Sequence, residues 1–209
     1  MSVNTSIEGR NKLGTATMLV HLGLMVSGMA AVITGPLAED YKHPDFSGYS
    51  LHSWLGAALA IAAVVRLWRA VAGPVEDRFY SWIPLSAGRL RQVREDLAGL
   101  MRLQLPERPA RQGVAGLVQA MGLLGFFFMA MTGSALYFVL EPGSKATGLA
   151  HDIKELHEVG VLLVLPFLAL HIGAVITHAL CGKQYWKQAF FIAENDSGVA
   201  GGCNQGEKS

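Results

Sequence analysis

Four long runs of apolar residues extend through the sequence, and most polar residues gather between them. The runs cover about residues 13–35, 51–72, 113–140 and 156–181. Each reaches the roughly 20 residues that a helix needs to cross a bilayer at a rise of about 1.5 Å per residue. Strands cross a membrane only in closed barrels, so the runs predict helices. The expected fold is an all-α membrane protein built as a four-helix transmembrane bundle.

The connection between the second and third runs is long and has a pattern of its own. Ser86 can cap a helix that we expect to continue to about Gln104. Apolar residues recur on one face of this helix, and arginines lie off that face. The apolar residues are Leu90, Val93, Leu97, Leu100 and Met101, and the arginines are Arg89, Arg91, Arg94 and Arg102. The pattern predicts an amphipathic helix on the cytoplasmic membrane surface, with a basic, solvated helix as the alternative.

Charged residues are few and unevenly placed. They make up 16% of the chain, against about 25% in an average soluble protein, which favours membrane spans over one large soluble core. Residues 66–111 carry nine arginines against five acids, and basic residues also precede the first span and follow the fourth. The other two connections are acidic or near neutral. Because positively charged loops stay in the cytoplasm, we expect a multi-pass protein of the bacterial inner membrane with both termini cytoplasmic.

We expect residues 1–192 to form a single transmembrane domain. The segment 193–209 is polar and rich in glycine, which predicts a disordered tail. The formal net charge of +1 gives no reason to expect a nucleic-acid partner. The lipid bilayer is therefore the first partner that the sequence indicates.

Five of the seven histidines lie inside or at the ends of the apolar runs, and they are the candidates for chemistry. The other two, His43 and His151, lie in connecting loops and are given no role. An ionisable residue is expensive inside a membrane, so a functional role is the first interpretation. His157 and His171 are 14 residues apart, which is about 3.9 turns and about 21 Å along a helix. They share a face at two depths, so each needs a partner from another helix.

Depth along the helices selects the partners. His52 and His157 begin the second and fourth spans, which run in the same direction, so they lie level near the outer surface. His21 lies about eight residues, or about 12 Å, from the cytoplasmic end of the first span, and His171 about 15 Å from that end of the fourth. The predicted pairs are therefore His52 with His157 outside and His21 with His171 inside. His178 lies nearer the cytoplasmic end and is the alternative to His171.

Two facing imidazoles are the axial ligands of a six-coordinate haem iron. Structural zinc takes four ligands, usually including cysteine. The carboxylates that iron or manganese sites in helix bundles use are absent at these depths except for Glu158. The chain has no C-x-x-C-H motif for covalent haem attachment. We therefore predict that His21, His52, His157 and His171 ligate the iron of two haem b groups, and we assign no catalytic residue.

Two further features fit such a cofactor, and each has a plainer alternative. Arg66 lies 14 residues after His52, at the depth of His171, where it can pair with a propionate of the inner haem. The alternative is that Arg66 extends to the membrane interface. Small residues near the histidines leave room for a porphyrin face or serve close helix packing. They are Gly23, Gly28, Gly56, Gly160 and Gly173.

The assembled residues resemble the prokaryotic cytochrome b561 superfamily over about residues 12–191. This superfamily includes b-type cytochrome subunits of hydrogenases and of other periplasmic oxidoreductases. The resemblance implies two haems whose axial ligands map onto the four histidines named above. The matching pieces are His21, Leu51-His52-x-x-x-Gly56, Val65-Arg66-Leu67-Trp68-Arg69, Leu156-His157-Glu158-x-Gly160 and Leu170-His171-Ile172-Gly173-Ala174.

The function we predict is transmembrane electron transfer between a periplasmic redox partner and membrane quinone. The chain would act as an electron-transfer cytochrome or as a subunit of a membrane oxidoreductase, and quinone exchange is what the resemblance implies. The alternative is a stand-alone superoxide:quinone oxidoreductase. The outer loops carry three lysines against six acids, which does not favour attraction of an anion. A haem-free carrier of protons or metal ions is the third hypothesis.

Overall fold

The structure is a computed structural model that describes residues 14–102, 104–106 and 112–182. Every regular element in these ranges is a helix. The long helices are α2 (Thr15–Thr34), α3 (Ser47–Ala72), α6 (Gly113–Val139) and α7 (Gly148–Leu180). The shorter elements are the 3-10 helices η1 (Gly35–Lys42) and η2 (Val75–Asp77) and the α-helices α4 (Phe79–Trp82) and α5 (Ala87–Leu100).

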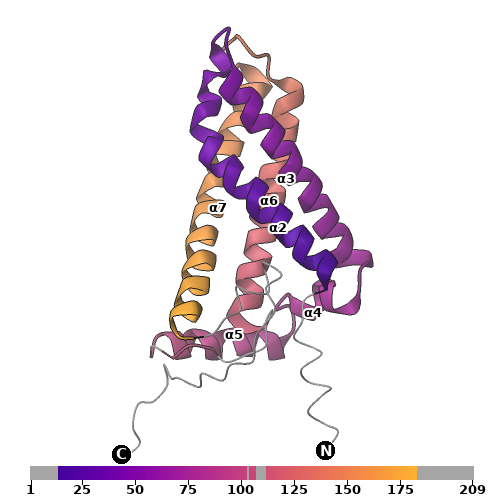
Figure 1. Cartoon of the computed structure of the whole chain (residues 1–209), viewed down its shortest axis with the longest axis vertical. Coiled ribbons are helices and arrows are strands. Elements are labelled where there is room, and N and C mark those ends of the chain that lie inside the picture. Colours follow the sequence, from indigo (N-terminus) through magenta and orange to yellow (C-terminus); the bar gives the residue numbers. More distant parts are fainter. Residues whose placement is uncertain (1–13, 103, 107–111, 183–209) are drawn as a thin grey trace, which may run out of the picture.

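Four segments in the described ranges are long and apolar enough to cross a membrane. The first is Thr15–Lys42, which consists of α2 and η1 together. The others are the helices Ser47–Ala72, Gly113–Val139 and Gly148–Leu180. Figure 1 shows the four long helices as one bundle, with α5 lying across one end. We call that end the α5 end and the opposite one, which carries η1, the η1 end. The prediction of an all-α, four-helix membrane protein is confirmed.

Two of the four spans begin earlier than the apolar pattern predicted. Helix α3 begins at Ser47 and α7 at Gly148, whereas the apolar runs begin at about 51 and 156. The difference arises because the first turns of a helix can be polar where they lie outside the hydrocarbon layer. His151, expected in a loop, is therefore an exposed residue of α7. The predicted tail at 193–209 lies outside the described residues.

The η1 end is closed by bonds between elements that are distant in sequence. The Asp40 carboxylate accepts the N–H groups of Gly48 and Tyr49, each at 2.7 Å, and so caps the first turn of α3. The N–H of Gly143 donates to the carbonyl oxygen of Tyr41 at 2.7 Å. A small apolar cluster packs behind these bonds and consists of Tyr41, Tyr49, Leu140 and Ala150.

At the α5 end, α5 closes the bundle as a cap. The hydroxyl of Ser86 accepts the N–H of Arg89 at 3.3 Å, as expected for the residue that begins a helix. Asp96 is buried and accepts the N–H of Val114 at 3.0 Å, which caps α6. The predicted apolar face is divided, because Val93 is buried while the other members are exposed. The exposed members are Leu90, Leu97, Leu100 and Met101. The helix ends at Leu100, four residues before the predicted Gln104.

The middle of the bundle contains an apolar layer. Phe126 of α6 and Phe167 of α7 meet edge to face with ring centroids 5.7 Å apart, a favoured aromatic geometry. Leu59 of α3 and Val164 of α7 complete this cluster. Gly122 allows the approach, since a Cβ there would lie 2.2 Å from the Phe167 ring. The layer separates the two ends of the bundle.

Candidate cofactor site

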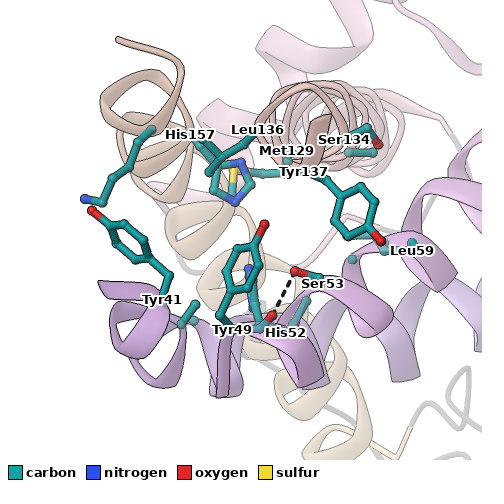
Figure 2. Close-up of a pocket in the computed structure, with 18 of the residues that line it drawn as sticks. Tyr41, Tyr49, His52, Ser53, Leu59, Met129, Ser134, Leu136, Tyr137 and His157 are labelled. Atoms are coloured by element: carbon teal, nitrogen blue, oxygen red, sulfur yellow. Dashed lines mark hydrogen bonds between the residues drawn. The ribbon is translucent and has the colours of Figure 1, made fainter. Parts of the chain in front are cut away.

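The structure brings His52 of α3 and His157 of α7 together near the η1 end. Their ring centroids are 6.2 Å apart, and the ring planes are inclined by 75°. Figure 2 shows the two side chains on opposite sides of one pocket. The two helices therefore present one imidazole each from level positions, although 105 residues separate them in sequence.

His21 of α2 and His171 of α7 form a second facing pair. Their ring centroids are 6.1 Å apart, and the planes are inclined by 74°. His171 also stacks on Phe167, with ring centroids 5.5 Å apart and planes inclined by 21°. This ring contact fixes one side of the His171 imidazole and connects it to the apolar layer in the middle of the bundle.

The spacing of both pairs fits a metal ion held between two imidazoles. A metal–imidazole nitrogen bond is about 2 Å, and the ring centre lies about 1 Å behind the nitrogen. Two such ligands on opposite sides of one ion therefore place their ring centres about 6 Å apart, close to the 6.1 and 6.2 Å observed. Within the described ranges, no group of three or more histidine, cysteine, aspartate or glutamate side chains could hold a metal ion. The donor set at each level is two imidazoles, which suits haem iron.

Threonine hydroxyls hold the histidines of the η1-end pair. The Nδ1 atom of His157 lies 2.8 Å from the Thr132 hydroxyl, and Nδ1 of His52 lies 3.3 Å from that of Thr34. Each hydroxyl also donates to a carbonyl four residues earlier in its own helix, at 2.9 Å from Thr132 and 2.8 Å from Thr34. A hydroxyl has a single hydrogen, so it accepts from the histidine Nδ1–H. This hydrogen bonding assigns the tautomer that leaves Nε2 free to bind a metal.

These two threonines were not among the residues predicted from sequence. A hydroxyl in an apolar helix usually bonds to the carbonyl one turn earlier, and both do so. The only signal was that Thr34 and Thr132 lie at the same depth as His52 and His157. That signal is weak, because other hydroxyl residues in the spans form the same carbonyl bond without a histidine partner, as Thr177 does to Gly173 at 2.8 Å.

A pocket of about 1080 Å³ surrounds the η1-end pair. This volume is at the upper limit of the roughly 300–1,000 Å³ typical of small-molecule and cofactor sites. Its wall is mostly apolar and aromatic, including Tyr41, Tyr49 and Tyr137. The lining also includes three charged residues, Glu39, Lys154 and Glu158. The pocket thus combines a mostly apolar wall for a flat ring with a few charged side chains.

The glycines near the histidines have different roles. Gly56 lines the pocket, and a Cβ there would meet nothing within 4 Å, which fits a site open to a porphyrin face. At Gly160 a Cβ would lie 2.4 Å from the Met129 sulfur, so this glycine serves close helix packing. Gly133 was not predicted, yet a Cβ there would lie 3.1 Å from Cε1 of His157.

The remaining predicted glycines divide in the same way. Gly28 lines the pocket, but a Cβ there would lie 3.0 Å from the Phe126 ring, so it also serves packing. At Gly23 a Cβ would make an ordinary contact of 3.7 Å with Ala62. Gly173 is exposed, with nothing within 4 Å of a Cβ. A glycine near a histidine in sequence therefore does not by itself mark the pocket.

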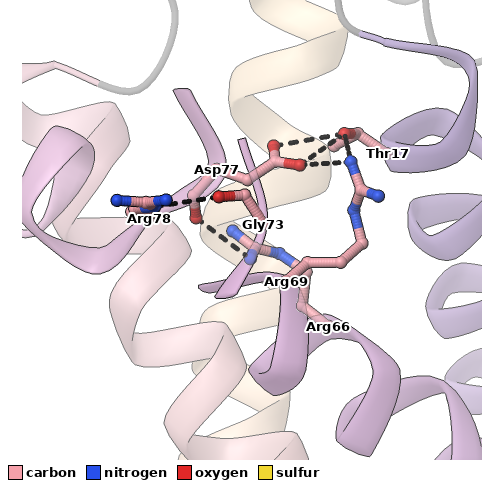
Figure 3. A network of polar contacts seen from close by, with 6 residues as sticks. All are labelled: Thr17, Arg66, Arg69, Gly73, Asp77 and Arg78. Carbon is pink, nitrogen blue, oxygen red and sulfur yellow. Dashed lines mark hydrogen bonds and ion pairs between the residues drawn. The ribbon is translucent and has the colours of Figure 1, made fainter. Parts of the chain in front are cut away.

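Arg66 is buried near the α5 end, in a polar network shown in Figure 3. Its Nη1 lies 3.5 Å from the carbonyl oxygen of Asp77. The Asp77 carboxylate is 1% exposed, pairs with Arg69 at 2.5 Å and accepts the Thr17 hydroxyl at 2.9 and 3.1 Å. Arg78 donates from Nε to the Gly73 carbonyl oxygen at 2.8 Å. The network ties the segment after α3 to the first turn of α2, and the propionate role of Arg66 stays a prediction.

The other histidines lie apart from the two pairs. His178 is in the last turn of α7. His43 directly follows η1 and is exposed, and His151 is exposed in the first turn of α7. The structure therefore brings together the four histidines that were predicted as ligands, while their role as ligands stays a prediction.

The fold and the paired histidines define a class: multi-pass helical membrane proteins with an imidazole pair near each end of one bundle. The family model for prokaryotic cytochrome b561 matches residues 12–191, so the chain belongs to the prokaryotic cytochrome b561 family. Membership indicates a b-type membrane cytochrome with haem b as cofactor and electron transfer as function. The comparisons with curated proteins and with solved structures gave no match.

Proposed function

We propose that this protein is a dihaem b-type cytochrome that carries electrons across the bacterial inner membrane. His52 and His157 would ligate one haem iron near the η1 end, and His21 and His171 a second near the α5 end. The observation that carries the proposal is the pair of facing imidazoles at each level, with ring centroids 6.2 and 6.1 Å apart. When bound, the haem irons supply the redox chemistry, and the chain positions and insulates them.

The surrounding residues supply what such centres need from a protein. Thr34 and Thr132 hold the η1-end imidazoles in one tautomer and orientation. The apolar layer around Phe126 and Phe167 excludes water between the two levels. Arg66, buried toward the α5 end, offers a cation to a haem propionate.

The orientation and the partners are part of the same proposal. The arginine-rich segment that contains α5 would lie in the cytoplasm with both termini, and the η1 end would face the periplasm. A periplasmic redox protein would exchange electrons at the η1 end, and membrane quinone at the α5 end, in either direction. Accessibility of single cysteines introduced at Asp45 and at Arg94 to a membrane-impermeant reagent would test the orientation, with only the first labelled in intact cells.

The decisive test is the haem content and spectrum of the full chain. We expect protein purified in detergent to contain about two protohaems per chain by pyridine haemochrome analysis, as two bis-histidine sites require. Both should be low-spin in the air-oxidised and dithionite-reduced states. Colourless protein would contradict the proposal and return the histidines to proton or metal-ion transport.

A superoxide:quinone oxidoreductase is the alternative activity. Two of the three charged residues that line the η1-end pocket are carboxylates, Glu39 and Glu158, which repel an anion. We therefore expect slow reduction of the haem by superoxide compared with a quinol, in stopped-flow measurements on the purified protein. Faster reduction by superoxide would favour the alternative.

A further inference from the structure

Four charged side chains form one cluster at the η1 end. Glu39 of η1 lies between two lysines, 2.7 Å from Nζ of Lys42 and 3.4 Å from Nζ of Lys154. Lys154, one turn before His157 in α7, also pairs with Glu158 of its own helix. The Lys154–Glu39 pair therefore joins α7 to η1, and both residues line the pocket.

The two lysines of this cluster differ in what they face. Lys154 lines the pocket that contains His52 and His157, and its side chain is 17% exposed. Lys42 does not contribute to the described lining of that pocket, and its side chain is 38% exposed. Lys154 and Glu39 both line the pocket, whereas Lys42 does not. A change of charge at Lys154 or Glu39 therefore acts on the pocket more directly than a change at Lys42.

We propose that Lys154 sets the reduction potential of the η1-end haem, a role that rests on the function proposed above. Reduction adds one electron to the pocket, and a nearby cation stabilises the reduced form, which raises the potential. Glu39 and Glu158 oppose this effect, but they are more exposed than Lys154. The Lys154–Glu39 pair thus affects the reduction potential of only one of the two proposed haems.

The test is a potentiometric titration of the full-length protein, followed by the haem absorption spectrum, with haem content measured for each variant. In Lys154→Gln, we expect one of the two titration components to shift to lower potential. At the potential where that component is half reduced in the unmodified protein, the ratio of reduced to oxidised haem in the variant should decrease by a factor of about 3 to 10. The other component should stay unchanged, because the two pairs lie about 21 Å apart along α7.

Three further variants make the result specific. Lys154→Arg keeps the charge and should restore the potential, and Glu39→Gln should raise the same component. Lys42→Gln removes an equal positive charge that pairs with the same carboxylate, and it should shift neither titration component. If Lys154→Gln loses haem, Glu39→Gln tests the charge pair instead: a rise confined to one component supports the proposal, and the absence of a rise overturns it.

The contrary results are distinct for the two proposals. Unchanged components in Lys154→Gln, equal shifts of both, or an equal effect of Lys42→Gln would overturn the role of Lys154 and leave the dihaem proposal standing. Fewer than two haems in the unmodified protein would instead contradict the dihaem proposal itself.

Discussion

Near the η1 end, His52 and His157 meet threonine hydroxyls and the aromatic wall of a pocket. Near the α5 end, His171 stacks on Phe167, and a polar network around the buried Asp77 joins α2, α3 and η2. The ring separations are nearly the same at the two levels, 6.2 and 6.1 Å. The same spacing of paired imidazole rings therefore occurs in two different surroundings.

The charged groups at the two ends differ in the same way. The η1-end ion pairs are partly exposed, so each contributes roughly 0–1 kcal/mol. The Arg69–Asp77 pair is largely buried, and removal of one partner of such a pair typically costs about 3–5 kcal/mol. Removal of one partner of an ion pair should therefore cost more stability at the α5 end than at the η1 end.

The largest expected effect is a selective loss of haem from one of the two proposed haem sites. His157→Ala should remove the haem of the η1-end pair and leave the other, and His171→Ala should do the reverse, so each variant keeps about half of the haem. The measurement is pyridine haemochrome content per chain, with the spectrum of the haem that remains. Because His178 lies apart from both pairs, His178→Ala is the control and should keep all of the haem. Loss of haem in that control instead of in His171→Ala would assign the ligand to His178.

The next effect concerns stability at the α5 end. Asp77→Ala should lower the free energy of unfolding by about 3–5 kcal/mol, because it leaves Arg69, whose side chain is only 20% exposed, without its carboxylate. Glu39→Gln, which breaks exposed pairs at the η1 end, should cost no more than about 1 kcal/mol. Thermal inactivation in detergent, followed by loss of native haem absorbance, compares the two. Equal losses would mean that charge has the same structural role at both ends.

A smaller effect should distinguish the supports of the histidines. Thr132→Val removes the acceptor for Nδ1–H of His157 and should weaken haem binding at the η1 end by about 10–100-fold. Thr177→Val is the matched control, because Thr177 makes the same carbonyl bond in an exposed part of α7. Haem transfer to apomyoglobin gives the relative affinities. Equal haem release by the two variants would contradict the assignment of the proton to Nδ1 of His157.

The smallest effect tests the fit around His157. Gly133→Ala places a methyl group about 3 Å from Cε1 of His157, so the ring must shift by a few tenths of an ångström. We expect a change in the low-spin electron paramagnetic resonance signal of the η1-end haem and a stability change below about 1 kcal/mol. Gly173→Ala has open space around it and should leave both haem signals unchanged.

The sequence by itself determined the four spans and the faces of their histidines. The 20-residue length follows from membrane thickness, and the placement of His157 and His171 on one face follows from the 3.6-residue period. Both are properties of single helices, which explains why depth along the helices predicted the same two pairs that the structure brings together. The amphipathic segment capped by Ser86 was predicted for the same reason.

Only the tertiary structure decided which residues support those histidines. The Thr34–His52, Thr132–His157 and Thr17–Asp77 contacts join residues 18, 25 and 60 positions apart. Each contact depends on how two elements rotate and tilt against one another. The donor and acceptor atoms must approach to about 2.7–3.2 Å, the usual length of a hydrogen bond, or slightly more. The apolar pattern and the helical period of the sequence do not specify how the helices rotate and tilt against one another. The pairing of the histidines was therefore predictable from depth, whereas the contacts that orient them required the packed bundle.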